Sequence, residues 1–387
     1  MIPGFSSIVA LGWAVSAPQP VSDPPTKPGF VAVQANPRAE ASASDERFAV
    51  FAPTSKPIRH KIDYEIFDFA LQNIVVSMGT SNRSVPYLPI QPTGTRIKQG
   101  AQSRYRLEGS MVGFSFFNRE VIDSFTLYRE ELQAIGDSIP IHTLPRNEQL
   151  AYWFNLHNVA MLEKLSLEWP LREPREVMVV GVALDDARFI TVQGVSLSLR
   201  DIREKIVFAH WRDPKVIYGF WRGEIGGPAL QPAAFSGQNV GSLLDLSAAE
   251  FVNALRGTEK RGGTLHVSRL YAEVAPFYFP DFVTDLRAHL QNYAEDEVGA
   301  ILAATTGAQP SINEPDIADL AGGSRGANYL AGSTTAGRPG IPPGVLDLLR
   351  QRQRKLEVMQ RRKEATGRVY FSNIDLPGDP PNKNAVE

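Results

Sequence analysis

Residues 147–162 are the feature that most constrains what this chain can fold into. Their apolar side chains recur on nearly every face of a helix, which is the pattern of a buried helix. Asn155, His157 and Asn158 nevertheless stand near the centre of that segment. A buried polar group costs free energy unless it finds a hydrogen-bond partner, and asparagine is a poor helix former. The segment therefore predicts either a functional site or a polar clasp inside the protein.

The composition of the chain excludes several classes of protein. Its 387 residues are enough for two or three domains. A formal net charge of −2 argues against a protein that binds nucleic acids or anionic membranes through overall positive charge. The absence of cysteine excludes disulfides, thiolate nucleophiles and iron–sulfur clusters. The six histidines lack the paired spacing of a metal site, and the glycine turn at 223–227 fits no nucleotide-binding fingerprint. We therefore expect neither a metal nor a cofactor.

The N-terminus resembles a short secretion signal. Residues 5–15 form an apolar run that is too short to span a bilayer. Ser16 and Ala17 follow it, and small residues at this point suit cleavage after Ala17. We therefore expect residues 1–17 to be a signal peptide and the protein to be periplasmic or in the cell envelope. Because positive residues are missing before the run, an apolar arm on a cytoplasmic protein is the alternative. No other apolar run is long enough for a membrane span.

Composition divides the rest of the chain into four segments. Residues 18–57 are rich in Pro, Ala and Ser and predict a disordered leader. Residues 58–304 hold the strong helix and strand patterns and predict one globular domain. Residues 305–343 are poor in large apolar side chains and predict a linker. Residues 344–387 predict a charged helix and a tail, and the basic helix at 344–365 is a candidate contact for a protein partner.

Periodicity in the globular segment predicts an α+β fold that is mostly helical and packs on a small antiparallel sheet. We place that sheet around Val192, Val216 and His266, with the 147–162 helix packed centrally against it. Residues 173–183 fit either a strand or a short helix. The expected helices cover residues 64–75, 117–135, 147–162, 198–209, 248–255, 281–293 and 296–304. The expected strands are a hairpin at 188–197 that turns at Gly194, and strands at 215–221 and 264–271.

Three motifs resemble the domain-of-unknown-function 547 family. Residues 150–160 read Leu-Ala-Tyr-Trp-Phe-Asn-Leu-His-Asn-Val-Ala, which is similar to the family's LAFWINLYNAL segment. Residues 194–203 are similar to its G-x-x-(L/F)-S-L-x-D-I-E segment. Residues 213–230 resemble its D-P-R-I-H-F-A-L segment and the S-C-P-x-L that follows it. The resemblance covers about residues 140–295.

The chain departs from the family's pattern at positions that could carry chemistry. Where the family has Glu, His and two Cys, this chain has Arg203, Ile217, Arg222 and Gly227. His157 stands where the family has Tyr. A cysteine nucleophile needs a thiolate and a base, and neither stands at the matched positions. The resemblance therefore implies a degenerate member that cannot use those side chains chemically.

His157 is the candidate catalytic residue, with Asn155 and Asn158 beside it. An imidazole can act as a general base near neutral pH, and the two asparagines can position a substrate. A base needs an acid or a nucleophile as its partner, and the sequence shows none near His157. We therefore favour a packed imidazole, together with two amides that bond the backbone of a neighbouring loop.

Four further residues are candidates for binding. Glu148 and Tyr152 continue the face of Asn155 along the helix, and as a binding site this face would be a polar groove. We favour instead a clasp that holds the backbone of a nearby loop. Arg222 and Glu224 flank the glycine turn, where they can bind an anion or each other. The alternative for this pair is an ordinary surface turn.

These observations predict an uncharacterised, exported member of the family that binds a ligand or a protein without catalysis. The alternative is a hydrolase or acyl transferase with its site around Asn155, His157 and Asn158. A third hypothesis is a scaffold that works through its C-terminal helix. A deep pocket floored by the three side chains would favour the enzyme, whereas a sealed core with each amide bonded to backbone would count against it.

Overall fold

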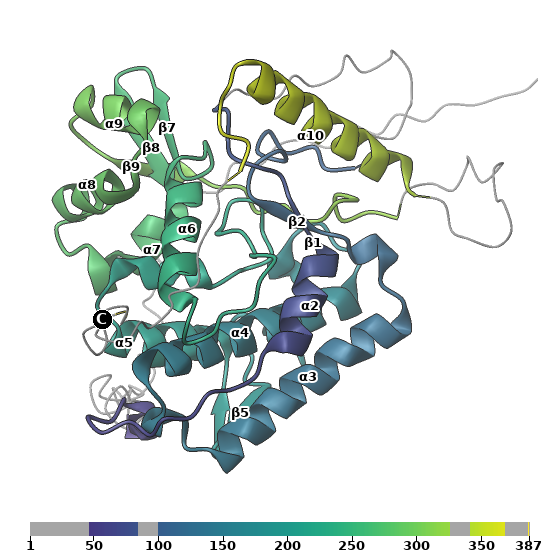
Figure 1. Ribbon diagram of the computed structural model, residues 1–387, viewed down its shortest axis with the longest axis vertical. Helices are drawn as coiled ribbons and strands as arrows, with labels where there is room; N and C mark the ends of the chain where they lie inside the picture. Colours follow the sequence, from purple (N-terminus) through teal and green to yellow (C-terminus); the bar gives the residue numbers. More distant parts are fainter. Residues whose placement is uncertain (1–45, 84–99, 326–340, 368–385, 387) are drawn as a thin grey trace, which may run out of the picture. The chain divides into compact units, whose positions relative to one another are not determined.

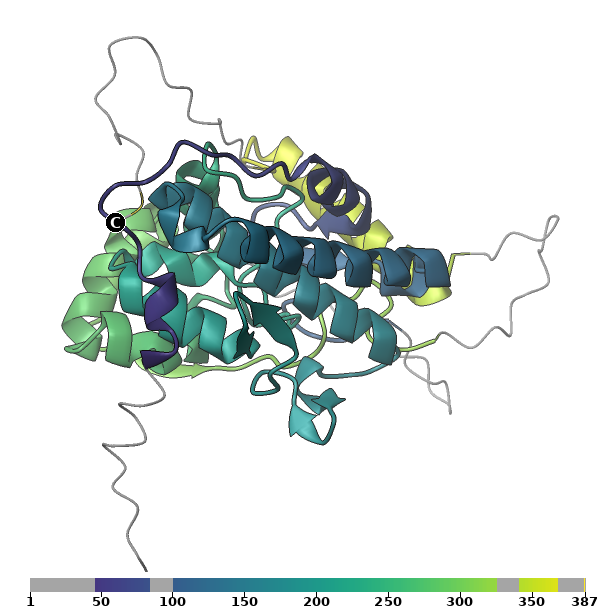
Figure 2. The ribbon, with the colours of Figure 1, turned by 90° about the horizontal axis from the view of Figure 1, so that it is seen from below.

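The buried helix predicted from the sequence is present as α4 (Arg146–Glu168), and other helices surround it (Figures 1 and 2). The computed structural model describes residues 46–83, 100–325, 341–367 and 386. Every residue of α4 from Glu148 to Glu163 is buried. Helices α3 (Arg119–Ser138) and α6 (Val240–Val252) and the π-helix η5 (Asp201–Val207) contact it. A helix contacted on several sides needs apolar side chains all round, which explains its composition.

Around α4 the described residues form a mostly helical α+β fold, as predicted. The remaining α-helices are α2 (Glu65–Ile74), α5 (Phe208–His210), α7 (Arg269–Tyr278), α8 (Phe282–Tyr293), α9 (Asp296–Ala303) and α10 (Pro343–Arg361). The 3-10 helices are η1 (Ala49–Phe51), η2 (Phe114–Phe116), η3 (Ile141–Thr143), η4 (Pro174–Glu176) and η6 (Pro214–Gly219). The strands are β1 (Val75–Ser77), β2 (Ser110–Val112), β3 (Met178–Val179), β4 (Val182–Ala183), β5 (Ile190–Val192), β6 (Val195–Leu197), β7 (Thr258–Arg261), β8 (Thr264–Ser268) and β9 (Gln309–Ile312).

Helix α3 lies along α4, and polar contacts fix the two helices against each other (Figure 2). The Arg129 guanidinium donates to the Glu163 carboxylate at 2.6 Å, and both side chains are buried. The Tyr152 hydroxyl donates to the Leu132 carbonyl at 2.9 Å. Gly136 permits this approach, because a Cβ there would lie 2.3 Å from the Tyr152 hydroxyl oxygen. Any larger residue at 136 would push the helices apart.

The helix predictions are largely confirmed, with two kinds of error. The apolar stripes of the first two helices place Ile66 and Leu127 inward, but these side chains are 72% and 66% exposed. Ser247 was expected to start a helix, yet α6 begins at Val240 and the Ser247 hydroxyl donates back to the Leu243 carbonyl. Serine bonds a backbone carbonyl one turn earlier as readily as it caps, so its position alone does not fix the start.

The single antiparallel sheet predicted around Val192, Val216 and His266 is wrong. Val192 lies in the β5–β6 hairpin, which turns at Gly194 as expected. His266 lies in a separate sheet of order β7–β8–β9, in which β7–β8 is antiparallel and β8–β9 is parallel. Val216 belongs to the 3-10 helix η6. The Asp213 carboxylate caps the start of this helix by accepting a hydrogen bond from the Lys215 backbone amide. A short buried apolar run does not by itself distinguish strand from helix.

The linker predicted at 305–343 is wrong for residues 305–325, the longer of its two described parts. Strand β9 pairs with β8, and the chain after it runs between other segments of the domain. The Val112 amide donates to the Ala318 carbonyl at 2.8 Å, and the Ile225 amide donates to the Asp316 carbonyl at 2.9 Å. Small residues can pack by their backbone, so a shortage of large apolar side chains does not require a linker here.

The leader predicted at 18–57 is also wrong where the structure describes it. Phe48 and Phe51 are buried, and the Phe51 ring meets the Trp153 ring edge-on at 5.0 Å. The predicted signal peptide and residues 18–45 lie outside the described residues, as do residues 326–340 of the expected linker. All described residues fall within one compact unit, Ser44–Glu387.

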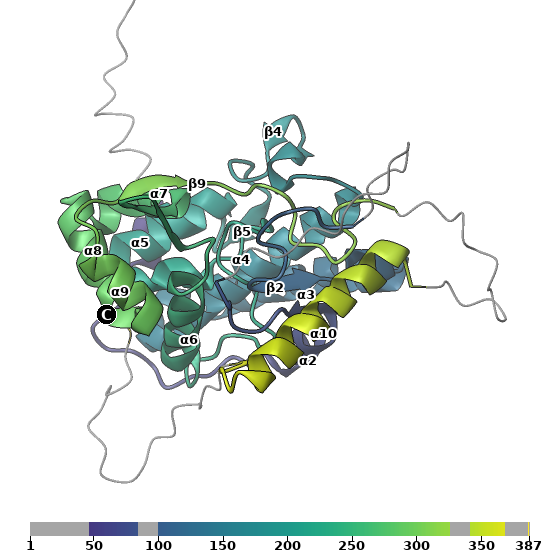
Figure 3. The same ribbon diagram turned by 90° about the horizontal axis from the view of Figure 1, so that it is seen from above.

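The C-terminal helix expected at 344–365 is confirmed as α10, and it packs on the domain (Figure 3). Val345, Leu348 and Met359 are buried on its inner face. The Lys355 ammonium donates to the carbonyls of Thr80 and Leu107 at 2.9 and 2.8 Å, and burial lowers its pKa to about 8. A protein partner for the exposed arginines of α10 stays a prediction. No described helix combines the length and the apolar character of a membrane span.

Candidate functional site

Asn155 clasps the backbone of a distant residue. Its amide nitrogen donates to the Phe235 carbonyl at 2.7 Å, and its amide oxygen accepts from the Phe235 backbone nitrogen at 3.0 Å. The side chain is 1% exposed. Both ends of the amide are therefore used by one residue of the segment that precedes α6. This satisfies two backbone groups that would otherwise be buried without partners.

Asn158 holds a second segment in the same way. Its nitrogen donates to the Gly219 carbonyl at 3.0 Å, and its oxygen accepts from the Trp221 backbone nitrogen at 3.0 Å. These partners end η6 and lead into the glycine turn. Gly219 has no side chain to block the approach, since a Cβ there would lie 2.4 Å from the Phe154 ring. The two asparagines thus tie two separate segments to α4.

Glu148 and Tyr152, the two binding candidates on this face, are both buried. Tyr152 is fully buried and bonds the Leu132 carbonyl. The Glu148 carboxylate is also buried, and it accepts hydrogen bonds from the backbone of Gly237 and Ile62. Burial raises the pKa of Glu148. The whole polar face of α4 therefore holds main chain, which is the alternative that the sequence favours for its asparagines.

His157 is sealed in the core and carries no proton on Nε2. Its exposed fraction is 0%, its Nδ1 lies 3.1 Å from Asn158 Oδ1, and its Nε2 lies 3.0 Å from Arg203 Nη1. A guanidinium can only donate, so Nε2 accepts and the ring proton sits on Nδ1. Burial and the Arg203 charge lower the pKa of His157 to about 3. This geometry does not favour catalysis, because both ring nitrogens are occupied and a substrate has no exposed surface to touch.

Arg203 links His157 to the surface. It lies in the π-helix η5, is 2% exposed, and donates to both oxygens of Asp185 at 2.7 and 2.6 Å. Burial alone would raise the pKa of Asp185, but the charge and hydrogen bonds of Arg203 lower it to about 2. Arg203 therefore bonds His157 on its buried side and Asp185 on the other.

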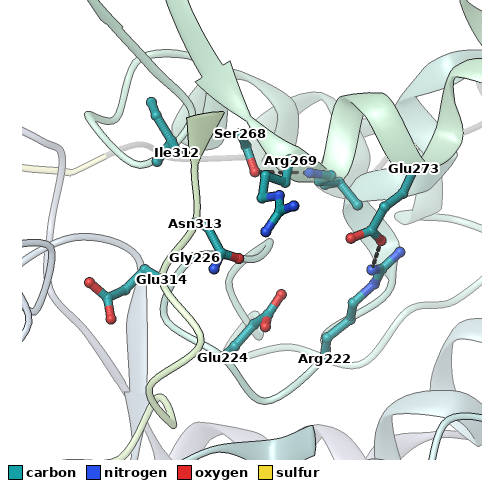
Figure 4. Close-up of a pocket in the computed structure, with 10 residues that line it drawn as sticks. Arg222, Glu224, Gly226, Ser268, Arg269, Glu273, Ile312, Asn313 and Glu314 are labelled. Carbon is teal, nitrogen blue, oxygen red and sulfur yellow. Dashed lines mark hydrogen bonds and ion pairs between the residues drawn. The ribbon is translucent and has the colours of Figure 1, made fainter. Parts of the chain in front are cut away.

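A charged pocket lies at the glycine turn, directly after the two residues that Asn158 holds (Figure 4). It has about 250 Å³ of space, including its open mouth. Three segments far apart in the sequence meet there: residues 222–226, the start of α7, and residues 312–314. Their side chains with polar groups facing the pocket are Arg222, Glu224, Ser268, Arg269, Glu273 and Asn313.

Arg222 and Glu224 both line this pocket, but they do not pair with each other. Arg222 forms its ion pair with Glu273 of α7. The Glu224 carboxylate has no hydrogen-bond or ion-pair partner within the described parts of the chain, whereas its backbone carbonyl accepts from the Gly227 amide. Burial raises the pKa of Glu224 to about 6; the Arg222 charge opposes this rise and the Glu273 charge adds to it. Gly227 lies beside this carboxyl: a Cβ at 227 would be 3.4 Å from Glu224 Cγ.

Sequence reasoning did not assign four of these six polar residues to a binding site: Ser268, Arg269, Glu273 and Asn313. Ser268 and Arg269 fall in the strand predicted at 264–271, but Ser268 ends β8 and caps α7 by accepting from the Leu270 amide. A serine before an amphipathic segment is a helix-start signal that could have shown this. Asn313 falls in the predicted linker, and no local signal places it beside the glycine turn.

The chemistry available in the pocket is charge and hydrogen bonding. Among the residues that the structure describes, no group of three or more His, Asp or Glu side chains is arranged to hold a metal ion. The hydroxyl of Ser268 is buried and engaged at the helix cap. No histidine lines the pocket in the described ranges. The arrangement suits the binding of a small charged molecule better than nucleophilic attack on one.

The comparisons with known proteins agree with the motifs. Residues 141–252 match the family model described as a protein of unknown function, DUF547. This range includes α4, the Asn155 and Asn158 clasps, Arg203 and the glycine turn. The resemblance read from the sequence is confirmed there. Neither the curated proteins nor the solved structures give a match.

Proposed function

We propose that this protein is a non-catalytic binding module. Residues 141–252 match the DUF547 family model, for which no function is known. The ligand of the module is a small polar molecule that enters the charged pocket beside Arg222 and Glu224. The observation that carries this proposal is the desolvated carboxyl of Glu224, which faces the pocket without a partner among the described residues. The charges of Arg222, Arg175 and Arg203 only partly offset this desolvation, and a bound ligand can supply a counter-charge in direct contact with the carboxyl.

The clasps on α4 support the non-catalytic half of the proposal. Asn155, His157 and Asn158 are the only polar trio that the sequence offers for the alternative hydrolase or acyl transferase. Their hydrogen-bonding atoms already serve the backbone of residues 219, 221 and 235 and the side chain of Arg203. Moving any of them to serve a substrate would leave buried groups unpaired.

A binding screen tests the proposal. Saturation-transfer NMR on the full chain would use a panel of small carboxylic acids, amines, amino acids and sugars. We expect at least one class to bind, and we expect Glu224→Gln to weaken that binding at least tenfold while circular dichroism shows an unchanged fold. Glu131→Gln, at an exposed site on α3, is the matched control and should bind as the wild type does.

Two results would overturn this function. One is the absence of binding by every class in the panel. The other is turnover of an ester, thioester or amide substrate that is lost in a folded His157→Gln variant, which would establish the enzyme instead.

We also propose that the protein is exported. The support is the apolar run at 5–15 followed by Ser16 and Ala17. Mass spectrometry of the protein purified from the cells that make it should find a mature chain beginning at Pro18. A Leu11→Arg variant, with the apolar run interrupted, should keep its N-terminus. Wild-type protein that retains Met1 would refute export.

A further inference from the structure

We propose that the charged pocket recognises a zwitterion of amino-acid size, with the ligand's carboxylate held by Arg269 and its ammonium held by Glu224. This inference rests on the proposed binding function and names the class of ligand. Neither the family match nor the sequence motifs point to such a molecule. The inference comes from the structure, in which two opposite charges face each other across the pocket without forming an ion pair.

Arg269 and Glu224 project into the pocket from opposite sides (Figure 4). Arg269 is the first residue of α7, and Glu224 belongs to the glycine turn. No ion pair within 4.0 Å joins them, and neither has another hydrogen-bond or ion-pair partner within the described parts of the chain. If they served only to neutralise each other, long flexible side chains could close that gap. A gap lined by one cation and one anion fits a guest that carries both signs.

The Arg269 side of the pocket favours an anion. Helix α7 has ten residues, and its N-terminus carries partial positive charge from unpaired backbone N–H groups. No acidic residue lies in its first turn to compensate that charge. The guanidinium of Arg269 adds a planar set of donors that matches a carboxylate. The two effects act at the same edge of the pocket.

The Glu224 side favours a cation. Arg222 is the nearest candidate to neutralise Glu224, but Glu273 holds it in an ion pair. Burial and the negative charge of Glu273 raise the pKa of Glu224, although the Arg222 charge opposes both. An ammonium group would reverse both effects, since it supplies a counter-charge and three hydrogen-bond donors. Asn313, whose amide also faces the pocket, can bond either end of such a ligand (Figure 4).

The charge balance of the pocket argues against simpler ligands. An anion alone would leave Glu224 unpaired and would be repelled by it. A cation alone would leave Arg269 unpaired in the same way. Only a ligand with both charges satisfies both sides.

The test compares three chemical forms of one ligand on the full chain. The common L-amino acids and glycine are screened first by isothermal titration calorimetry at pH 7.5. The best binder is then compared with its N-acetyl derivative, which lacks the ammonium, and with its amide, which lacks the carboxylate. We expect each blocked form to bind at least tenfold more weakly. We also expect affinity to rise with pH through about 6, as Glu224 ionises.

Variants assign each end of the ligand. Glu224→Gln should abolish the discrimination against the N-acetyl form, and Arg269→Gln should abolish the discrimination against the amide. Lys260→Gln and Glu131→Gln, at exposed positions on β7 and α3, are the matched controls and should leave both discriminations unchanged. Because Arg269 is exposed, its loss is not expected to unfold the protein.

The outcomes separate this inference from the function on which it rests. If a blocked form, inorganic phosphate or a simple amine binds at the pocket as well as the free amino acid, the zwitterion is refuted and the binding function stands. If amino acids bind but Glu224→Gln and Arg269→Gln change nothing, the site is refuted. If no compound in either screen binds, both proposals fall.

Discussion

At the scale of single residues, His157 shows how burial converts a reactive side chain into a structural one. Histidine is reactive near neutral pH because its pKa lies there. In this protein both of its ring nitrogens are occupied, by Asn158 and by Arg203, and no part of it is exposed. Burial and the neighbouring guanidinium both disfavour the protonated ring. The residue type suggested a general base. Its surroundings occupy both ring nitrogens, so neither can take a proton from a substrate.

This environment predicts how stability depends on pH. The folded pKa of His157, about 3, is below the value near 6.5 of an unfolded chain, so its contribution is fully present above pH 6.5 and is lost as pH falls toward 3. In the wild type that loss should reach about 2 kcal/mol between pH 6.5 and pH 5. His157→Gln should be less stable than wild type at pH 7.5, and the difference should shrink by about the same amount at pH 5.

Urea denaturation at the two pH values measures both free energies of unfolding. A difference between wild type and His157→Gln that stays constant with pH would mean that His157 takes up its proton in the folded state at the same pH as in the unfolded chain. That result would reopen its role as an acid or base.

At the scale of elements, α4 is the central helix, and its side chains hydrogen-bond the backbone of several distant segments. Its apolar side chains fill the core, and three of its polar side chains bond main chain from other parts of the fold. Asn155 holds residue 235, Asn158 holds residues 219 and 221, and Glu148 holds residues 62 and 237. The segments held by Asn155 and Asn158 flank the glycine turn on both sides. The clasps therefore position the turn that carries Arg222 and Glu224.

Removing one clasp should cost much more than removing a similar bond at the surface. Asn158→Ala leaves the Gly219 carbonyl and the Trp221 amide buried without their partner, so we expect it to lower the free energy of unfolding by about 2–4 kcal/mol. Asn73→Ala is the matched control. Its amide also donates to a backbone carbonyl, that of Phe69, but on the exposed side of α2, and about 0.5 kcal/mol is expected.

Thermal and urea unfolding of both variants would measure these losses. Equal losses at the two sites would show that Asn158 is not a clasp. In that case the helix would retain the motif for another reason.

At the scale of the whole molecule, the pocket exists only because segments distant in sequence come together. The glycine turn, the start of α7 and residues 312–314 each contribute charged or polar groups. The last of these belongs to a stretch whose composition is that of a linker. It enters the domain through backbone hydrogen bonds, such as that from Gly226 to the Glu314 carbonyl at 2.9 Å. A Cβ on Gly226 would lie 2.7 Å from that carbonyl, so glycine is needed for this approach.

The sequence by itself determined the local elements and the family resemblance of residues 141–252. The buried helix, the hairpin at Gly194, the helix that starts after Asp281 and the clasp on α4 all follow from periodicity, turn residues and the cost of burying polar groups, which are properties of neighbouring residues. It also named Arg222 and Glu224 as a pair worth attention. Only the tertiary structure decided that Arg222 pairs with Glu273, that Arg269 faces Glu224, and that His157 is out of reach. The reason is physical: ion pairs, desolvation and exposure depend on which surfaces meet, and residues 45 or more positions apart leave no local pattern to show it.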